Sequence, residues 1–498
     1  MAPLRSSISR HGLPLLAGAL FPLGLAPFDF WPATLLSLSL FYLAQRTREA
    51  SFVTGWLFGA GLFLCGASWI FVSINVYGDA PVPLAGLLTL CFCLGLALLH
   101  GVQVSLFARF GSTSQTWAPV SFASLWVLFE WLRSWLLTGF PWLYAGYTAL
   151  DSPLRGWVPV IGVYGTGFLI AGLAASLSGV LSTRASRGSV ILTACFLALW
   201  AAGPLLAEKN WSQPDGERVS LAVYQPNIPL EKKWDRRYFF PILDQYANAT
   251  AGLYEDADIV LWPESALPAY QDQLGDYLED QSRSAARGNA TLITGIPMRI
   301  EGDRHNSIMA LGQGSGVHHK QKLVPFGEYV PLEQWLRGVI AFFDLPMSSF
   351  VPGADATPRL KANNHVIAPF ICYEIVYPDF VLNGARDASI IVTVSNDSWF
   401  GRSIGPLQHL QMAQYRALET GKPVVRGTNN GVSAIINEKG DLISRSEQFQ
   451  EEVLLGTIQP YRGETPLTRF APFIPWSLAA LFLTALFFRK HSDRADPD

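Results

Sequence analysis

The stretch Val366–Pro378 reads VIAPFICYEIVYP, an apolar run that ends on a cysteine and continues directly into tyrosine and glutamate. Its β-branched and aromatic residues predict a buried strand that ends near Cys372. The other four of the five cysteines lie in apolar stretches elsewhere, so the polar region has no disulfide and no Cys/His spacing of the zinc type. A lone cysteine of this kind is more often a core residue than a nucleophile. Its role therefore depends on the sequences that accompany it.

Two further stretches end a predicted strand on charged residues: DIVLWPES contains Glu264, and HHKQKLVPFGEYVP contains Lys320 and Glu328. Strand ends are where α/β sheets usually assemble a site. A thiol with a pKa of about 8.5 needs a general base, which a carboxylate supplies, and a lysine stabilises the oxyanion of an attacked carbonyl. Alone, Glu264 is explained as a helix cap and Lys320 as a solvated side chain. With Cys372 they predict acyl-transfer chemistry without histidine.

Outward from these stretches, from about Glu208 to Thr468, strand-like and helix-like segments alternate. Helical patterns lie between several strands, as in Gln273–Arg287 and Leu407–Thr420. This alternation predicts a layered α/β domain. The expected strands are VSLAVYQ, DIVLWPE, ATLITGIP, NSIMAL, VIAPFICY, ASIIVTVS, PVVRGT, VSAIIN and EEVLLGTI.

The composition indicates that much of the remaining chain faces lipid. The 498 residues are 50% hydrophobic and only 15% charged, whereas a soluble domain carries about 25% charged residues. Mean hydropathy is +0.24. The formal net charge of -3 gives no reason to expect a nucleic-acid partner.

Apolar segments of membrane-spanning character precede and follow the α/β region. The first two are short and broken by prolines. The N-terminal run has features of a signal peptide, but the many spans that follow favour an uncleaved first helix. The expected spans are Gly12–Ala26, Pro32–Ala44, Phe52–Ile74, Val82–Phe107, Pro119–Leu137, Val158–Leu181, Val190–Leu206 and Phe470–Phe488.

Basic residues predict how these spans are oriented, because cytoplasmic loops are enriched in lysine and arginine. Eight spans with both termini in the cytoplasm put every basic cluster on that side and residues 208–468 on the outer face, which is periplasmic in a bacterium. The domains expected are 1–207 and 469–498 in the membrane and 208–468 outside it. The clusters comprise Arg5, Arg10, Arg46, Arg48, Arg109, Arg184, Arg187, Arg489, Lys490 and Arg494.

The motifs LWPESALP, K-x-x-LVPFGEYVP and CYE resemble the three signatures of the nitrilase superfamily. The whole chain, spans included, resembles the apolipoprotein N-acyltransferase family. That resemblance implies a polytopic α-helical membrane domain of about eight transmembrane helices plus an αββα sandwich, in the bacterial inner membrane. It also implies transfer of an acyl chain from a phospholipid, through a cysteine thioester, to the α-amino group of the diacylglyceryl-cysteine of apolipoproteins. No cofactor or metal is implied, and we expect a monomer.

The resemblance also assigns roles to individual residues of this sequence. Lys322 stands where the family usually has histidine, which leaves two lysines close together; the spacing of eight residues before Glu328 favours Lys320 as the catalytic one. The implied roles are general base for Glu264, oxyanion stabiliser for Lys320, nucleophile for Cys372, supporting residues for Glu328, Tyr373 and Glu374, and acyl-pocket aromatic for Trp234.

Two aromatic loops provide a hypothesis for lipid entry. VIAFFDLPMSSF contains Phe342 and Phe343, and NDSWFGRSIGP contains Trp399. We expect both to border an opening at the outer leaflet that keeps water from the thioester; ordinary packing over the sheet is the alternative.

Glu130 and Arg133 lie three residues apart within the fifth predicted span. Charges inside a span are costly and are usually paired or functional. Their spacing favours an internal ion pair over a site for a lipid headgroup.

Two other functions remain open at this stage. A membrane-tethered amidase or nitrilase would pass its acyl group to water with the same residues, although one helix suffices as a tether. A non-catalytic receptor with a degenerate domain would not need all of Glu264, Lys320 and Cys372.

Overall fold

The computed structural model describes residues 2–47, 50–182, 185–329, 349–354, 359–470, 476–477 and 479–484. The chain divides into two compact units. One contains residues 1–71, 81–209 and 470–498, and the other contains 72–80 and 210–469. The short segment 72–80 thus belongs to the second unit, although in the sequence it stands between two apolar helical segments of the first. There Ser73 Oγ donates a hydrogen bond of 2.7 Å to the Trp399 carbonyl.

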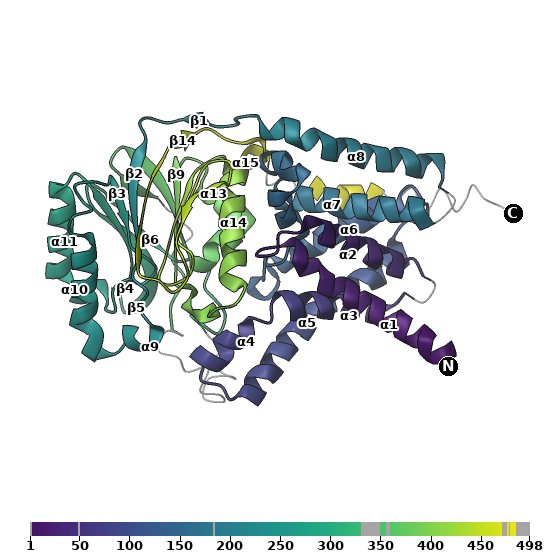
Figure 1. Ribbon diagram of the computed structural model, residues 1–498, viewed down its shortest axis with the longest axis horizontal. Coiled ribbons are helices and arrows are strands. Elements are labelled where there is room, and N and C mark those ends of the chain that lie inside the picture. The colour runs from purple at the N-terminus through teal and green to yellow at the C-terminus, as the bar shows by residue number, and fades with distance from the viewer. Residues whose placement is uncertain are drawn as a thin grey trace. The chain divides into compact units, whose positions relative to one another are not determined.

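The first unit is helical, and each of the apolar segments expected before residue 208 coincides with helix (Figure 1). Proline stands near the start of several of these helices, where its missing N–H costs nothing. The helices are α1 (Ala2–Leu20), α2 (Trp31–Gln45), α3 (Phe52–Gly66), α4 (Ile70–Val72), α5 (Val82–Phe110), α6 (Ala118–Arg133), α7 (Val158–Ser182) and α8 (Arg187–Ala207). Shorter 3-10 turns are Phe21–Gly24, Leu136–Thr138, Ala145–Asp151 and Pro153–Trp157.

Three helical segments within the described residues are long and apolar enough to cross a membrane, or four if one bent pair counts as a single span. The three are Val82–Phe110, Pro153–Leu181 and Arg187–Ala207, and the bent pair joins Phe52–Gly66 to Ile70–Tyr77 at 62°. The expected last span, Phe470–Phe488, lies about half outside the described residues. The helical character of the first unit is therefore observed, while the expected number of eight spans is not reached by this criterion.

Glycine allows helices α1 and α3 to approach each other closely. A Cβ atom at Gly61 would lie 2.1 Å from the Leu15 carbonyl oxygen, so no larger residue fits without separating the two helices. Small residues at helix contacts are typical of membrane proteins, where packing rather than the hydrophobic effect drives association.

Glu130 and Arg133 are both buried, and both form hydrogen bonds with the backbone of the segment after α6. Glu130 Oε1 accepts a hydrogen bond of 2.7 Å from the Ala145 N–H. Arg133 donates to the carbonyls of Trp142 at 2.9 Å and Leu143 at 3.4 Å. The two buried charges therefore hold residues 142–145 through these hydrogen bonds, and the expected ion pair between them stays a prediction.

Two six-stranded sheets form the centre of the second unit. The first has the order β13-β2-β3-β4-β5-β6, with β2, β3 and β4 parallel. The second has the order β12-β11-β10-β9-β8-β7, with β8, β9 and β10 parallel. The strands are β1 (Gln213–Pro214), β2 (Val219–Gln225), β3 (Ile259–Leu261), β4 (Thr291–Ile300), β5 (Asp303–Gly312), β6 (Val317–His319), β7 (Leu360–Ala362), β8 (His365–Ile371), β9 (Ile390–Ser395), β10 (Val424–Thr428), β11 (Ala434–Ile436), β12 (Leu442–Arg445), β13 (Glu452–Ile458) and β14 (Tyr461–Arg462).

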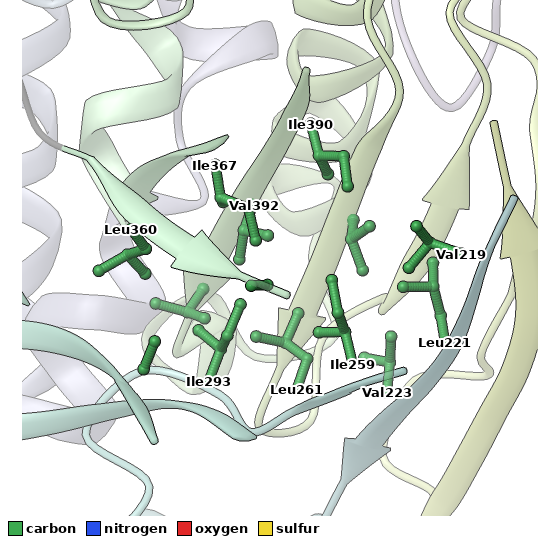
Figure 2. Close-up of a cluster of buried hydrophobic side chains, with 14 of the residues drawn as sticks. Val219, Leu221, Val223, Ile259, Leu261, Ile293, Leu360, Ile367, Ile390 and Val392 are labelled. Atoms are coloured by element: carbon green, nitrogen blue, oxygen red, sulfur yellow. The ribbon is translucent and has the colours of Figure 1, made fainter. Parts of the chain in front are cut away.

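Alternation along the strands divides their side chains between two cores. Leu221 and Val223 of β2 point between the sheets, where they meet residues such as Ile367 and Val392 of the second sheet (Figure 2). The intervening Ala222 and its neighbours face the helices on the outside of the first sheet instead. This period of two is what a strand buried on both faces requires.

Helices cover the outer face of each sheet, so the unit has four layers in the order helix, sheet, sheet, helix (Figure 1). The predicted α/β layered architecture is therefore observed. The helices are α9 (Leu230–Lys233), α10 (Phe239–Thr250), α11 (Gly275–Arg287), α13 (Pro378–Gly384), α14 (Gly405–Thr420) and α15 (Pro466–Phe470). Short turns are Ser73–Tyr77, Arg236–Tyr238, Gln271–Gln273, Cys372–Val376 and Asp397–Phe400.

Candidate active site

Cys372 follows the last residue of β8 and opens a short 3-10 turn. Its φ angle is +50°, in the left-handed region that residues other than glycine rarely adopt. The residue is partly exposed and packs against the core between the sheets. Burial raises the pKa of the Cys372 thiol well above its ordinary value; Glu264 raises it further and Lys320 opposes the shift. The resting sulfur is therefore a protonated thiol that needs a base.

Lys320 follows β6 and lies buried between two carboxylates. Its Nζ is 3.2 Å from Glu264 Oε1 and 2.9 Å from Glu328 Oε1. Burial alone would lower the pKa of Lys320, but the charges of Glu264 and Glu328 outweigh burial and raise it. Lys320 is thus a fixed ammonium group at any physiological pH.

Glu264 follows β3 and is held by donors from three other parts of the fold. Oε1 accepts from Asn306 Nδ2 at 2.8 Å as well as from Lys320, and Oε2 accepts from the Asn396 N–H at 2.8 Å. Gly295 of β4 lets this turn lie close to the sheet, because a Cβ there would be 2.7 Å from the Glu264 Cα. The carboxylate therefore has little freedom of orientation.

Glu328 completes the cluster from the loop after β6. Asn306 Nδ2 donates to its Oε1 at 2.8 Å, and the Val324 N–H donates to its Oε2 at 2.8 Å. One amide group thus bridges both carboxylates that flank Lys320.

Glu374 joins the turn of Cys372 to the strand end of Lys320. Its Oε2 accepts from the Ile371 N–H at 2.8 Å and lies 2.9 Å from His318 Nε2, while its Oε1 accepts from the Gln321 N–H at 2.6 Å. Burial alone would raise the pKa of Glu374, but His318 and these hydrogen bonds lower it. The buried, ionised carboxylate of Glu374 therefore holds Ile371, which precedes Cys372, close to Gln321, which follows Lys320.

The other residues that were predicted for the site contact different parts of the fold. Lys322 is exposed, with its Nζ over the Tyr377 and Phe380 rings at 5.8 and 5.7 Å, so Lys320 is the lysine that meets the carboxylates. Tyr373 packs edge-on against Tyr377 at 5.2 Å. Phe342 and Phe343 lie outside the described residues.

Both predicted tryptophans present part of their surface to solvent. Trp234 is 41% exposed directly after α9. Trp399 is partly exposed and contacts the Tyr77 ring edge-on at 5.5 Å. Segment 72–80 thus covers one side of the Trp399 turn.

Asn306 and Lys233, which were not predicted as site residues, are buried and contact the Glu264 turn. Lys233 Nζ donates to the Glu264 carbonyl at 3.2 Å. Both lie in stretches already singled out, NSIMAL and KKWD, but only the pairing of β4 with β5 and the approach of α9 bring them to Glu264. A third missed feature is the buried group Asp397, His409 and Arg426 beside Cys372. Among the described residues, no cluster of His, Cys, Asp or Glu has the makings of a metal site.

We expect the buried amine of Lys233 to give the protein a distinctive dependence of stability on pH. Burial lowers the pKa of Lys233 from 10.5 to about 8, against a smaller opposing effect of Glu264. Since the unfolded chain binds this proton more tightly, Lys233 destabilises the fold below about pH 8. That penalty, roughly 3 kcal/mol, is relieved as the pH rises toward 10.5. The stability of the wild type relative to Lys233→Met should therefore rise across that interval.

The measurement is the unfolding midpoint of both proteins in detergent between pH 7 and 10.5. Lys232→Met is the matched control, because Lys232 is the exposed neighbour in the same helix. If the unfolding midpoints of the wild type and of Lys233→Met changed with pH in the same way, the proposed effect of the buried amine would be contradicted.

Comparison with known proteins gives the same division of the chain. Residues 17–176 match the family description "Apolipoprotein N-acyltransferase N-terminal domain", and residues 220–466 match "Carbon-nitrogen hydrolase". A solved CN-hydrolase superfamily protein from Xanthomonas campestris aligns with a TM-score of 0.38 and 16% identity, covering 52% of this chain and 97% of that one.

Relatives that match this chain over nearly its whole length are considerably more similar to it in sequence than that solved structure is. Apolipoprotein N-acyltransferase from Pseudomonas aeruginosa is 46% identical over 95% of this chain and 93% of its own. The enzyme of the same name from Azotobacter vinelandii is 44% identical over 98% of each chain. With both halves matched and the similarity extending over nearly all residues, the chain belongs to the apolipoprotein N-acyltransferase family.

Proposed function

We propose that this protein moves an acyl chain from a phospholipid to Cys372 and then to the α-amino group of a diacylglyceryl-modified apolipoprotein. The observation that carries this proposal is the position of Lys320, whose Nζ lies 3.2 Å from Glu264 and 2.9 Å from Glu328. Glu264 and Lys320 are also close enough to Cys372 for their charges to shift the pKa of its thiol. Membership of the family supports the choice of donor and acceptor.

In the first half of the reaction, Glu264 accepts the thiol proton of Cys372 as sulfur attacks the ester carbonyl of the phospholipid. The base is required because the pKa of the thiol is raised. Lys320 stabilises the oxyanion of the tetrahedral intermediate, and its charge is already in place because Glu264 and Glu328 hold it. The C–O bond then breaks, Glu264 returns the proton to the leaving oxygen, and a lysophospholipid departs from the thioester.

In the second half, the neutral α-amine of the acceptor attacks the thioester carbonyl. With a pKa of about 8, a useful fraction of this amine is unprotonated at neutral pH. Glu264 takes the proton from nitrogen, the C–S bond breaks, and Cys372 recovers its proton. The products are an amide and the starting enzyme, so the proposed reaction consumes no nucleotide.

We assign substrate contacts to the aromatic residues around the site. Trp234 and Trp399 each expose surface next to elements that touch Glu264: Lys233 precedes Trp234, and Asn396 lies three residues before Trp399. Phe342 and Phe343 belong to the loop that we expect to border the same opening.

We further propose a topology of eight spans, with domains 1–207, 208–468 and 469–498, both termini in the cytoplasm and the catalytic domain in the periplasm. Three helices that are long and apolar enough to cross a membrane support three of these spans, and the bent pair supports a fourth if it counts as one. A membrane-impermeant thiol reagent applied to intact cells should label a cysteine placed at exposed Arg283. Labelling that occurs only after the membrane is broken would show that the catalytic domain faces the cytoplasm.

The test of function supplies the purified protein with phospholipid in mixed micelles and a diacylglyceryl-modified peptide that has a free α-amine. Mass spectrometry should detect N-acylated peptide and lysophospholipid in equal amounts. A peptide with its α-amine acetylated is the matched control and should remain unchanged. Free fatty acid in place of acylated peptide would identify a membrane-bound hydrolase.

A further inference from the structure

The backbone of Cys372 is held in a conformation that it does not prefer. Its φ of +50° is left-handed, which costs an L residue other than glycine about 1–2 kcal/mol. Such a conformation persists only where the surroundings determine it. Glu374 holds the preceding N–H of Ile371, so the question is what holds the carbonyl side.

His409 of α14 supplies that contact. Its Nε2 lies 3.2 Å from the Cys372 carbonyl oxygen, a length at which the ring donates a hydrogen bond to the carbonyl. His409 is 1% exposed. It therefore acts on the cysteine backbone from behind, away from solvent.

Asp397 and Arg426 fix the orientation of the His409 ring. Asp397 Oδ1 is 3.1 Å from His409 Nδ1, and Arg426 donates to Asp397 Oδ2 at 2.6 Å. The same Arg426 nitrogen is 3.1 Å from His409 Nδ1, and Ser395 Oγ donates to Asp397 at 2.6 Å. Burial and the charge of Arg426 lower the pKa of His409, so the ring is neutral and carries a single N–H. A neutral ring that accepts the Arg426 N–H at Nδ1 has its proton on Nε2, which then donates to the Cys372 carbonyl, while Asp397 holds Arg426 in place.

The cost of this arrangement indicates that it serves a purpose. Asp397, His409 and Arg426 are at most 1% exposed, and charged groups are buried only at considerable expense unless each is paired. Burial alone would raise the pKa of Asp397, but Arg426 and His409 lower it well below its ordinary value. A cluster that served only to join α14 to the sheet would not need opposite charges beside Cys372, whose backbone is left-handed.

We propose that His409, oriented by Arg426 and through it by Asp397, is a positioning residue that holds Cys372 in its left-handed conformation and so presents the thiol to Glu264 and Lys320. The inference rests on the proposed role of Cys372 as nucleophile. His409 acts through the backbone of that residue and touches neither substrate nor thioester.

Two substitutions of His409 separate positioning from simple packing. His409→Gln keeps an N–H donor near the place of Nε2, whereas His409→Leu keeps apolar volume and removes the donor. Glu419→Gln is the matched control, because Glu419 is also 1% exposed in α14 and pairs with Arg416 at 3.1 Å.

Each full-length variant is measured in detergent for its rate of acyl-enzyme formation from phospholipid, its rate of alkylation at Cys372 by iodoacetamide, and its unfolding midpoint. Mass spectrometry of the peptide that contains Cys372 separates it from the exposed Cys65, Cys91 and Cys195. Should His409→Leu fail to fold, His409→Asn replaces it, since its amide is too short to reach the carbonyl.

We expect His409→Leu to slow both reactions about 100-fold, as a 1 Å misplacement of a reacting group does. His409→Gln should restore most of each rate, and Glu419→Gln should lower the unfolding midpoint with normal rates. Wild-type rates in His409→Leu, or equal losses in both His409 variants that follow the unfolding midpoint, would overturn the proposal. Alkylation requires no lipid, so it tests His409 even if the proposed function fails.

Discussion

Cys372→Ala is expected to abolish the acyl-enzyme and to lower N-acylation of the peptide by about 10⁴-fold or more, because the groups of such a cluster act as a unit. In the proposed mechanism the sulfur of Cys372 attacks the ester in the first step and is the leaving group in the amide-forming step. Glu264 and Lys320 remain in place without it, but they have no bond to form. Intact-protein mass spectrometry after incubation with phospholipid measures the loss directly.

Cys195→Ala is the matched control, because Cys195 is an exposed cysteine of helix α8 in the other unit. It should acylate at the wild-type rate. Acyl-enzyme that still accumulates in Cys372→Ala, bound to any other residue, would refute the assignment of the nucleophile.

Glu264→Gln should slow acyl-enzyme formation about 10³-fold, the usual contribution of a general base. The substitution is close to isosteric, but its amide cannot take the thiol proton. The effect should be large because the pKa of the Cys372 thiol is raised, so very little thiolate forms unaided at neutral pH. For the same reason the variant should recover part of its rate as the pH rises toward the thiol pKa, where the medium removes the proton.

The measurement is the single-turnover acylation rate of both proteins between pH 7 and 10. Glu451→Gln is the control, since this carboxylate accepts from Tyr224 at 2.8 Å outside the cluster. A constant ratio of the two rates across this range would show that Glu264 is not the base.

Local sequence carries much of this fold. Strand β2 could be predicted because VSLAVYQ is apolar on both faces, and the structure places its alternate residues in two different cores. The helices of the first unit follow equally from the apolar runs that precede residue 208. Segment 72–80 could not be assigned to the second unit, because its membership depends on contacts such as that of Ser73 with Trp399, 326 residues away.

In the candidate site, too, local sequence predicts neighbours along the chain but not contacts between residues far apart in it. Lys320 and Glu328 are eight residues apart, so a local motif presents them together. Asn306 is 42 residues from Glu264, and His409 is 37 residues from Cys372. Each is an ordinary polar residue until tertiary packing gives it a partner. Helical spacing could place Glu130 and Arg133 on one face of a helix, but it could not show their hydrogen bonds to residues 142–145.

The most direct test of the whole account is a chase of isolated acyl-enzyme. The protein is loaded from a phospholipid with an isotope-labelled acyl chain, separated from free lipid, and mixed with diacylglyceryl peptide in the absence of any donor. We predict that the label leaves Cys372 and appears as an amide on the peptide amine within one turnover. Label that stays on the protein, or that leaves only as free fatty acid at the same rate with and without peptide, would contradict the transfer mechanism.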